Sequence, residues 1–367
     1  SAPRVASTSQ APRASQDGPM ATRADLVFAE TVIPVPDAYL TAEGCTQARR
    51  DWTFPGHTHR TVHETLVRDL GDEQVVDALM TTARCDASGC ALTPPLPVLE
   101  GLTREGRAHV AATLARYPVN AQYVLPFRRE ATDTPFSASP GLPPAAREAV
   151  ARLTWRDGER QVFADLAGAC AYATNDLERR AVVRAIHLQR SLLVSLRTGT
   201  EHVDRLVQTY PPRMRRQLRA ALEDAQRLGQ SELPLSTLLP PWVRARTGRY
   251  PVRGDRGLNC FWSALHFFDG DTAEHVESTD LALRDIFQRY ERVRGQSLRF
   301  GDVMLFYADD DATPIHAAVH LFAGVVFTKN GITLIQPWRL ARVETLTLDY
   351  PNIRRIDVWR PQGLDEE

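Results

Sequence analysis

The sequence predicts an α+β protein, in which a mostly helical domain precedes a domain that packs a helix on a small antiparallel sheet. Through most of residues 59–228, apolar residues recur at intervals of three and four, the period of amphipathic helices. From about residue 302 the pattern changes to short apolar runs separated by turn residues, which indicates strands. A stretch rich in Pro, Gly and Arg, residues 232–257, precedes this change. We therefore expect domains at residues 25–240 and 241–367.

The composition excludes several classes of protein. Of the 367 residues, 43% are apolar and 24% are charged, and the formal net charge is -1. These are the proportions of a globular protein, and they give no reason to expect a nucleic acid as partner. No apolar run approaches the roughly 18 residues of a membrane span. Residues 1–24 begin with a stretch rich in Ser, Ala, Pro and Arg, which predicts a flexible tail like the start of a processed secreted protein.

The helices of the first domain follow an extended segment at residues 25–35, which Pro34 and Pro36 end. Asp72 and Thr103 are the expected N-caps of two of them. Residues 160–228 are expected to form a bundle of two long and two shorter helices. The predicted helical segments are residues 61–71, 72–85, 103–117, 143–155, 161–196, 200–210 and 211–228.

The second domain is expected to begin with two helices and to continue with strands. One short helix starts near Cys260, and another covers most of residues 278–293. The predicted strands are residues 302–307, 315–322, 325–329, 332–336 and 353–360.

The five cysteines are an odd set: Cys45, Cys85, Cys90, Cys170 and Cys260. Cys85 and Cys90 enclose a small polar turn, which suits a short disulfide loop, and Cys45 could pair with Cys170. Cys260 would then be left as a free thiol. This pattern favours a secreted, periplasmic or cell-envelope protein, whereas five reduced, buried cysteines in a cytosolic protein is the other interpretation.

No metal or other cofactor is expected. The Cys85–Cys90 pair has no second close pair of Cys or His at zinc-ligand spacing. His57, His59 and His63 are interpreted as a polar loop entering a helix. The run Asp309 to Asp311 is interpreted as a solvated loop, because no calcium-ligand spacing surrounds it.

The stretch around Cys260 carries the candidate chemistry. Asn259 is a good N-cap, which makes Cys260 the first helical residue, where unpaired backbone N–H groups and the helix dipole favour a thiolate. His316 and His320 share one face of a predicted strand and offer a proton acceptor.

The residue that orients the histidine depends on the turn between the next two strands. A three-residue loop puts Thr328 and Asn330 on the histidine face, whereas a two-residue turn puts Phe327 and Lys329 there. A polar partner favours the first arrangement, and we choose Asn330. Lys329 is notable as the one lysine of the chain.

These motifs resemble the NlpC-type cell-wall cysteine peptidases, a family with a papain-like fold. Tyr250 precedes the sequence RGDRGLNC, and GDVMLFY and HAAVHLFAG match the later strands of the family. The resemblance covers residues 242–360. It implies that Cys260 is the nucleophile, His316 the base and Tyr250 a residue that helps to hold the oxyanion. The sequence departs from the family in having Phe261-Trp262 where Ser-Gly follows the cysteine.

The expected function is therefore that of a cysteine peptidase or amidase, a thiol-dependent hydrolase of amide bonds. Cys260 attacks, His316 moves the proton and Asn330 orients the imidazole, while His320 and Thr328 line the cleft. The resemblance implies peptidoglycan stem peptides as the substrate. Two alternatives are a papain-like acyltransferase and a non-catalytic cell-wall-binding protein on a degenerate peptidase fold.

Overall fold

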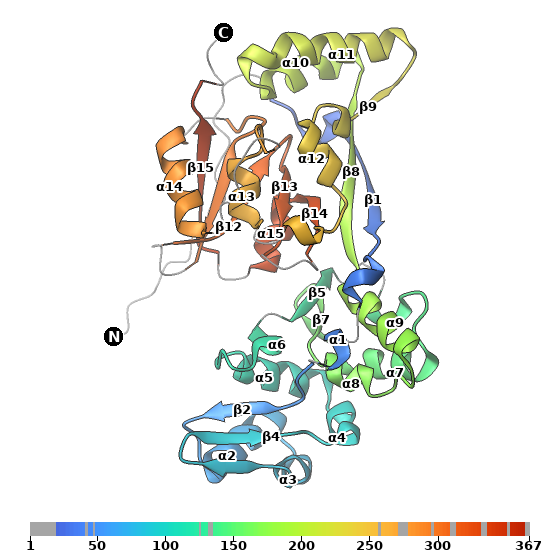
Figure 1. The fold of residues 1–367 in the computed structure, drawn as a ribbon, viewed down its shortest axis with the longest axis vertical. Coiled ribbons are helices and arrows are strands. Elements are labelled where there is room, and N and C mark those ends of the chain that lie inside the picture. Colours follow the sequence, from blue (N-terminus) through green and yellow to red (C-terminus); the bar gives the residue numbers. More distant parts are fainter. Residues whose placement is uncertain are drawn as a thin grey trace, which may run out of the picture. The chain divides into compact units, whose positions relative to one another are not determined.

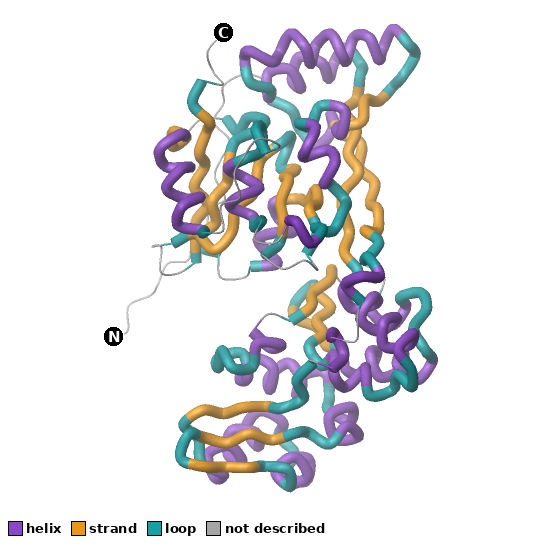
Figure 2. Tube along the Cα trace, in the orientation of Figure 1, coloured by secondary structure: helices purple, strands orange, loops and turns teal. Residues whose placement is uncertain are grey.

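Figure 1 shows the fold of the protein in a computed structural model. The residues that the structure describes are 20–40, 43–46, 48–124, 126–130, 135–255, 258–270, 278–294, 297–308, 313–331, 336–350 and 353–363. They form helices and small antiparallel sheets (Figure 2), so the predicted α+β class is confirmed.

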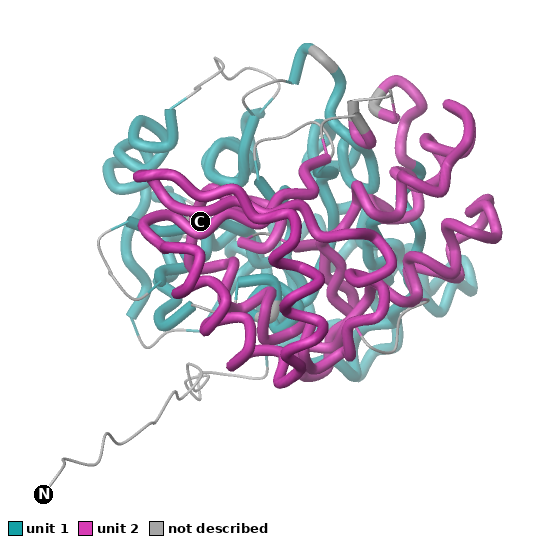
Figure 3. Tube along the Cα trace, turned by 90° about the horizontal axis from the view of Figure 1, so that it is seen from below, with its two compact units in different colours: residues 1–34, 189–367 teal, residues 35–188 magenta. Residues whose placement is uncertain are grey.

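The chain divides into two compact units, coloured separately in Figure 3. Unit 1 comprises Ser1–Pro34 and Gln189–Glu367, and unit 2 comprises Val35–Leu188. Residues 25–34 and 189–240, which we assigned to the helical domain, thus belong to the unit that contains Cys260. The reason is the pairing of two strands that are far apart in the sequence, which periodicity alone does not reveal.

An antiparallel sheet of six strands, in the order β10-β15-β11-β12-β13-β14, dominates unit 1. Four of these strands, β11, β12, β13 and β15, were predicted; β10 and β14 were not. The predicted strand at residues 332–336 lies, apart from its last residue, outside the described residues, as does the run Asp309 to Asp311. The strands are β10 (Tyr290–Val293), β11 (Val303–Tyr307), β12 (Pro314–His320), β13 (Val325–Lys329), β14 (Trp338–Arg342) and β15 (Arg355–Pro361).

Helices cover both faces of this sheet because its central strands are apolar on both sides. The helices α13 (Cys260–Leu265) and α14 (Thr279–Arg289) share a core with alternate strand residues, among them Ala317 and Val319. The residues of opposite parity, such as Ala318, pack with α15 (Val343–Asp349). The expected helices at Cys260 and at residues 278–293 are confirmed, although the second ends at Arg289, where β10 begins.

A second sheet in unit 1 joins β1 (Leu26–Ile33), β8 (Gln189–Arg197) and β9 (Glu232–Pro234). The prediction of a helix over residues 161–196 was therefore wrong at its C-terminal end. Leu192, Val194 and Leu196 are buried and alternate with more exposed residues, as a strand requires. The same apolar run also fits a helical period, and the pairing with β1 decides between the two.

The expected bundle over residues 160–228 does not form. That stretch contains β7 (Arg160–Phe163) and β8 as well as helices, because its strands complete two sheets. The remaining helices of unit 1 are α10 (Thr200–Thr209), α11 (Arg215–Arg227) and α12 (Pro241–Arg246), with 3-10 turns at Arg23–Asp25, Pro212–Met214, Leu235–Thr237 and Arg253–Asp255.

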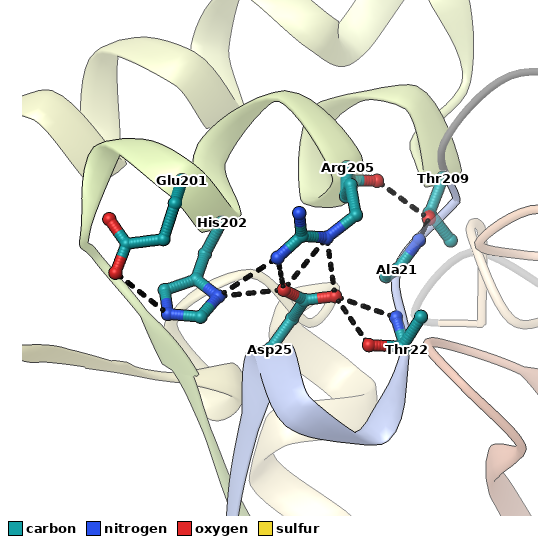
Figure 4. A network of polar contacts seen from close by, with 7 residues as sticks. All are labelled: Ala21, Thr22, Asp25, Glu201, His202, Arg205 and Thr209. Atoms are coloured by element: carbon teal, nitrogen blue, oxygen red, sulfur yellow. Dashed lines mark hydrogen bonds and ion pairs between the residues drawn. The ribbon is translucent and has the colours of Figure 1, made fainter.

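The buried carboxylate of Asp25, just before β1, contacts side chains of α10 within unit 1 (Figure 4). Asp25 is fully buried and accepts hydrogen bonds from His202 and Arg205 of α10 and from the backbone of Thr22. Burial by itself would raise the pKa of Asp25, but these hydrogen bonds, led by that of Arg205, outweigh it and hold the pKa well below its usual range. The start of β1 is therefore tied to α10 by charge, in addition to the pairing of β1 with β8 in the sheet.

Unit 2 consists of short helices around two three-stranded sheets, β2-β4-β3 and β5-β7-β6. The expected N-caps are confirmed: Asp72 accepts from Val75 N–H at 3.1 Å and Thr103 from Gly106 N–H at 3.0 Å. Its helices are α1 (Glu43–Thr46), α2 (His59–Leu70), α3 (Glu73–Met80), α4 (Leu96–Gly101), α5 (Arg104–Leu114), α6 (Ala121–Val124), α7 (Pro144–Leu153), α8 (Leu166–Cys170) and α9 (Asp176–His187). Its other strands are β2 (Trp52–Pro55), β3 (Arg84–Asp86), β4 (Gly89–Leu92), β5 (Phe127–Glu130) and β6 (Trp155–Asp157), and 3-10 turns lie at Asp37–Tyr39 and Phe136–Ala138.

Both predicted disulfides are present, Cys45–Cys170 and Cys85–Cys90, and Cys260 is free and buried. Disulfides persist in oxidising compartments, which suits a protein outside the cytosol. None of the helices in the described part of the chain is long and apolar enough to cross a membrane.

Candidate active site

Cys260 occupies the first position of α13, as the sequence predicts. The side chain of Asn259 caps the helix, with Oδ1 accepting from Trp262 N–H at 2.9 Å. Phe261, Trp262 and Leu265 are buried in the core of unit 1 and hold the helix against the sheet. The bulky pair that replaces Ser-Gly of the resembled family is therefore part of the core.

Cys260 is only 5% exposed, and the surroundings of its thiol act on the pKa in opposite directions. Burial is the larger effect and raises the pKa of Cys260 to about 11. Hydrogen bonds from the backbone of Ala317 and Phe261 and the charge of Lys329 act to lower that pKa. The thiol is thus protonated at neutral pH, but groups that can stabilise a thiolate already face the sulfur.

The turn between the paired residues Leu321 and Val325 has three residues, Phe322 to Gly324, whereas the three-residue loop that we expected ran through Val325; both arrangements put even-numbered residues of the two strands on one face. Val319 pairs with Phe327 and His320 with Val326, and Leu321 N–H donates to Val325 O at 2.8 Å. This register places Thr328 on the face of His316.

Thr328, not Asn330, is the polar partner of His316. Its Oγ1 lies 2.9 Å from His316 Nε2 and donates to Ala317 O at 3.1 Å. Asn330 instead donates to Asp349 Oδ2 at 3.3 Å. Our choice of Asn330 was wrong because the hairpin register alone does not say how far each side chain reaches.

His316 is held as a neutral imidazole. Ala317 O can only accept, so both contacts of Thr328 Oγ1 are hydrogen bonds in the tautomer in which His316 donates from Nε2, and this tautomer leaves Nδ1 as an acceptor. Nδ1 is buried and has no hydrogen-bond partner among the described residues. Burial, and then the charge of Arg339, lowers the pKa of His316 to about 3.

Within the described residues no hydrogen bond joins Cys260 to His316: Cys260 shares a core with Ala317 and Val319 on one face of the sheet, whereas His316 lies against Phe306 and Tyr350 on the other. The sulfur faces the backbone N–H of Ala317, the residue that follows His316. The ring of Tyr350 stacks on His316 with centroids 4.7 Å apart, and the charge of Cys260 contributes to a raised pKa of Tyr350, after burial. Hydrogen bonds of catalytic groups are often long before substrate binds, so the missing contact does not by itself rule out the pair.

His320, the second candidate base, has a structural role. Its Nδ1 donates to Arg299 O at 3.0 Å, its backbone N–H donates to Asp302 O, and burial lowers its pKa. Four residues separate it from His316, roughly 13 Å along a strand. It stabilises the hairpin end of β12 and does not face Cys260.

Tyr250 is buried beside β14, next to the bridge between Arg249 and Trp338. Burial raises its pKa, so the phenol is neutral and can donate a hydrogen bond. Its role at the oxyanion stays a prediction.

The site residues predicted from the sequence did not include Lys329. Its side chain is fully buried on β13, Nζ donates to Gly331 O at 2.8 Å, and the ammonium lies 5.8 Å from the centroid of the Trp338 ring. Burial lowers the pKa of Lys329 to about 8, although the charges of Cys260 and Asp255 act to raise it. The uniqueness of this lysine in an arginine-rich chain was the available signal, because an arginine does not fit a compact buried site equally well.

Among the residues that the structure describes, no three His, Cys, Asp or Glu side chains gather as a metal site. His57 contacts Tyr117 and His63 contacts Asp77, so these two histidines have separate partners. The resemblance to the NlpC-type peptidases rests on the motifs alone, since no family model, curated protein or solved structure matches the chain.

Proposed function

We propose that unit 1 is a thiol-dependent hydrolase of amide bonds, with Cys260 as nucleophile and His316 as base. The observation that carries the proposal is the arrangement at the ends of β12 and β13. There, Thr328 fixes the Nε2 side of His316, Nδ1 remains an unpaired acceptor, and the sulfur of Cys260 faces the next residue along the strand. Nucleophile, base and orienting group are the three parts that such chemistry requires.

In the proposed reaction, Nδ1 of His316 takes the proton of the Cys260 thiol as the sulfur attacks the substrate carbonyl. The backbone N–H groups at the start of α13 stabilise the oxyanion, and the Lys329 ammonium stabilises the thiolate that forms. His316 then delivers its proton to the leaving amine. Water attacks the resulting thioester, again giving a proton to His316, and releases the acid with the free thiol.

The resemblance to the NlpC-type family supports a papain-like fold for this unit and peptidoglycan stem peptides as substrates. The disulfides agree with a location where such a substrate is found. Transfer of the acyl group to an amine, in place of water, would use the same residues.

One observation favours a second candidate, a non-catalytic binding protein. The Cys260 thiol is almost fully buried and its pKa is raised, which are also properties of a structural cysteine.

Turnover of peptidoglycan fragments by the full chain, compared with Cys260→Ser, tests the proposal. The four other cysteines form disulfides, so native iodoacetamide labelling reports on Cys260 alone. We expect hydrolysis to be lost in Cys260→Ser and reduced about a hundredfold or more in His316→Ala. Thr328→Val should slow turnover less, and Thr328→Ser should restore it. Activity that survives Cys260→Ser would refute a thiol mechanism. If the protein neither turns over the fragments nor is labelled in its native state, the non-catalytic binding protein is the better interpretation.

A further inference from the structure

An open groove of about 470 Å³ lies in unit 1 between α14 and the start of β12. It is lined from the other side by Thr313 and Pro314, and from α14 by Asp280, Leu283, Arg284, Phe287 and Gln288. Its volume lies in the range of pockets for small molecules and short peptides. None of these residues takes part in the chemistry proposed above.

The five residues from α14 follow helical spacing and therefore share one face of the helix. Leu283 is 6% exposed and anchors this face in the core, whereas Phe287 is 45% exposed. The Phe287 ring rests on Trp359 of β15 with centroids 4.9 Å apart, so it is supported from behind. The floor of the groove is thus apolar and held in place.

Two opposite charges flank this floor. Asp280 and Arg284 are exposed and one helical turn apart, and within the described residues neither side chain makes a hydrogen bond or an ion pair. Elsewhere on the surface, Arg179–Asp176 and Arg219–Asp204 form ion pairs. An occupant that carries one cation and one anion, with an apolar group between them, would complement the groove in both charge and polarity.

The groove lies close to the thiol on both of its sides. Thr279, next to Asp280, accepts a hydrogen bond at 3.3 Å from the side chain of Asn259, the residue before Cys260. On the strand, Pro314 is three residues from Ala317, roughly 10 Å at the rise of a β-strand. A peptide of a few residues can span that distance.

We propose that this groove is a subsite for a dipolar peptide, whose ammonium pairs with Asp280, whose carboxylate pairs with Arg284 and whose apolar side chain lies on Leu283 and Phe287. That the groove binds a substrate rests on the proposed function, whereas binding of the peptide can be measured without catalysis.

The test uses the full chain with Cys260→Ala, so that binding is measured without turnover. The probe is the blocked tripeptide acetyl-Lys-Leu-Glu-amide, and calorimetry measures its affinity against versions with norleucine for Lys or Gln for Glu. We expect saturable binding that weakens about threefold or more for each neutral version. Asp280→Asn should abolish the preference for Lys, and Arg284→Gln the preference for Glu.

Asp285→Asn is the matched control, since it removes a charge from the same helix outside the groove and should leave both preferences intact. Phe287→Ala should weaken all three peptides equally. Absence of saturation at millimolar concentration, or equal affinity for charged and neutral peptides, would overturn the subsite. Turnover with no charge preference would refute this inference alone, whereas charge-selective binding without turnover would refute only the proposed hydrolase.

Discussion

Replacing Lys329 by methionine should change how the stability of unit 1 depends on pH. The substitution keeps the length of the side chain and removes its charge, and both proteins carry Cys260→Ser so that no thiol titrates beside it. Lys329 is fully buried, and burial lowers its pKa from 10.5 to about 8. Keeping the ammonium charged in the fold therefore costs free energy that methionine does not.

The pKa shift of Lys329 determines the size of the change in stability, because proton binding and folding are linked. A shift from 10.5 to about 8 corresponds to about 3 kcal/mol of destabilisation at pH 7, where the lysine is protonated in both states. Between the two pKa values the unfolded chain binds more protons than the folded chain, so the stability of the protein with Lys329 rises with pH across that window. From pH 7 to pH 9.5 the gain is about 2 kcal/mol. Loss of the Nζ hydrogen bond to Gly331 offsets about 1–3 kcal/mol of the benefit of methionine at pH 7.

Urea unfolding at pH 7 and pH 9.5, followed by circular dichroism, measures this difference. We expect the stability of Lys329→Met, relative to the protein that keeps the lysine, to fall by about 2 kcal/mol between the two pH values. Lys329→Arg, which stays charged at both pH values, also lacks a group that titrates in this window, so its stability relative to the protein with lysine should fall by the same amount. A difference between methionine and lysine that is independent of pH would show that the ammonium is not strained by burial.

Two further predictions concern stability and the thiol. Removing Cys45–Cys170 by a double alanine substitution should cost about 5 kcal/mol in the chain-entropy description, against about 2 kcal/mol for Cys85–Cys90, since the first closes 125 positions of sequence and the second only 5. Thermal unfolding of the two variants measures this, and equal losses would count against it. Asn259→Ala should lower stability by about 1 kcal/mol through loss of the helix cap, while Asn259→Asp keeps the cap and raises the thiol pKa by its negative charge. Labelling rates across pH check the second effect, and a lowered thiol pKa in Asn259→Asp would disprove it.

Local patterns in the sequence were sufficient for much of the structure around Cys260. The N-cap Asn259 and the helix that follows it depend on residues within one turn of each other, and the structure confirms both. The face that His316 shares with Thr328 follows from the alternation of a strand and a three-residue loop. The disulfide Cys85–Cys90 was also predictable, because only a small polar turn separates the two cysteines, whereas the pairing of Cys45 with Cys170 was one possibility that the structure then showed.

The sequence by itself thus determined the class of fold, the helix that presents Cys260 and the strand that carries His316. Only the tertiary structure decided that β1 and β8 pair across more than 150 residues, which sets the bounds of the two units. It also decided that Thr328 contacts His316 in place of Asn330, and that Lys329 is buried beside the thiol. The physical reason is the same in each case. Side-chain contacts, burial and desolvation depend on residues that folding brings together, and the local hydrophobic periodicity of the sequence does not contain that information.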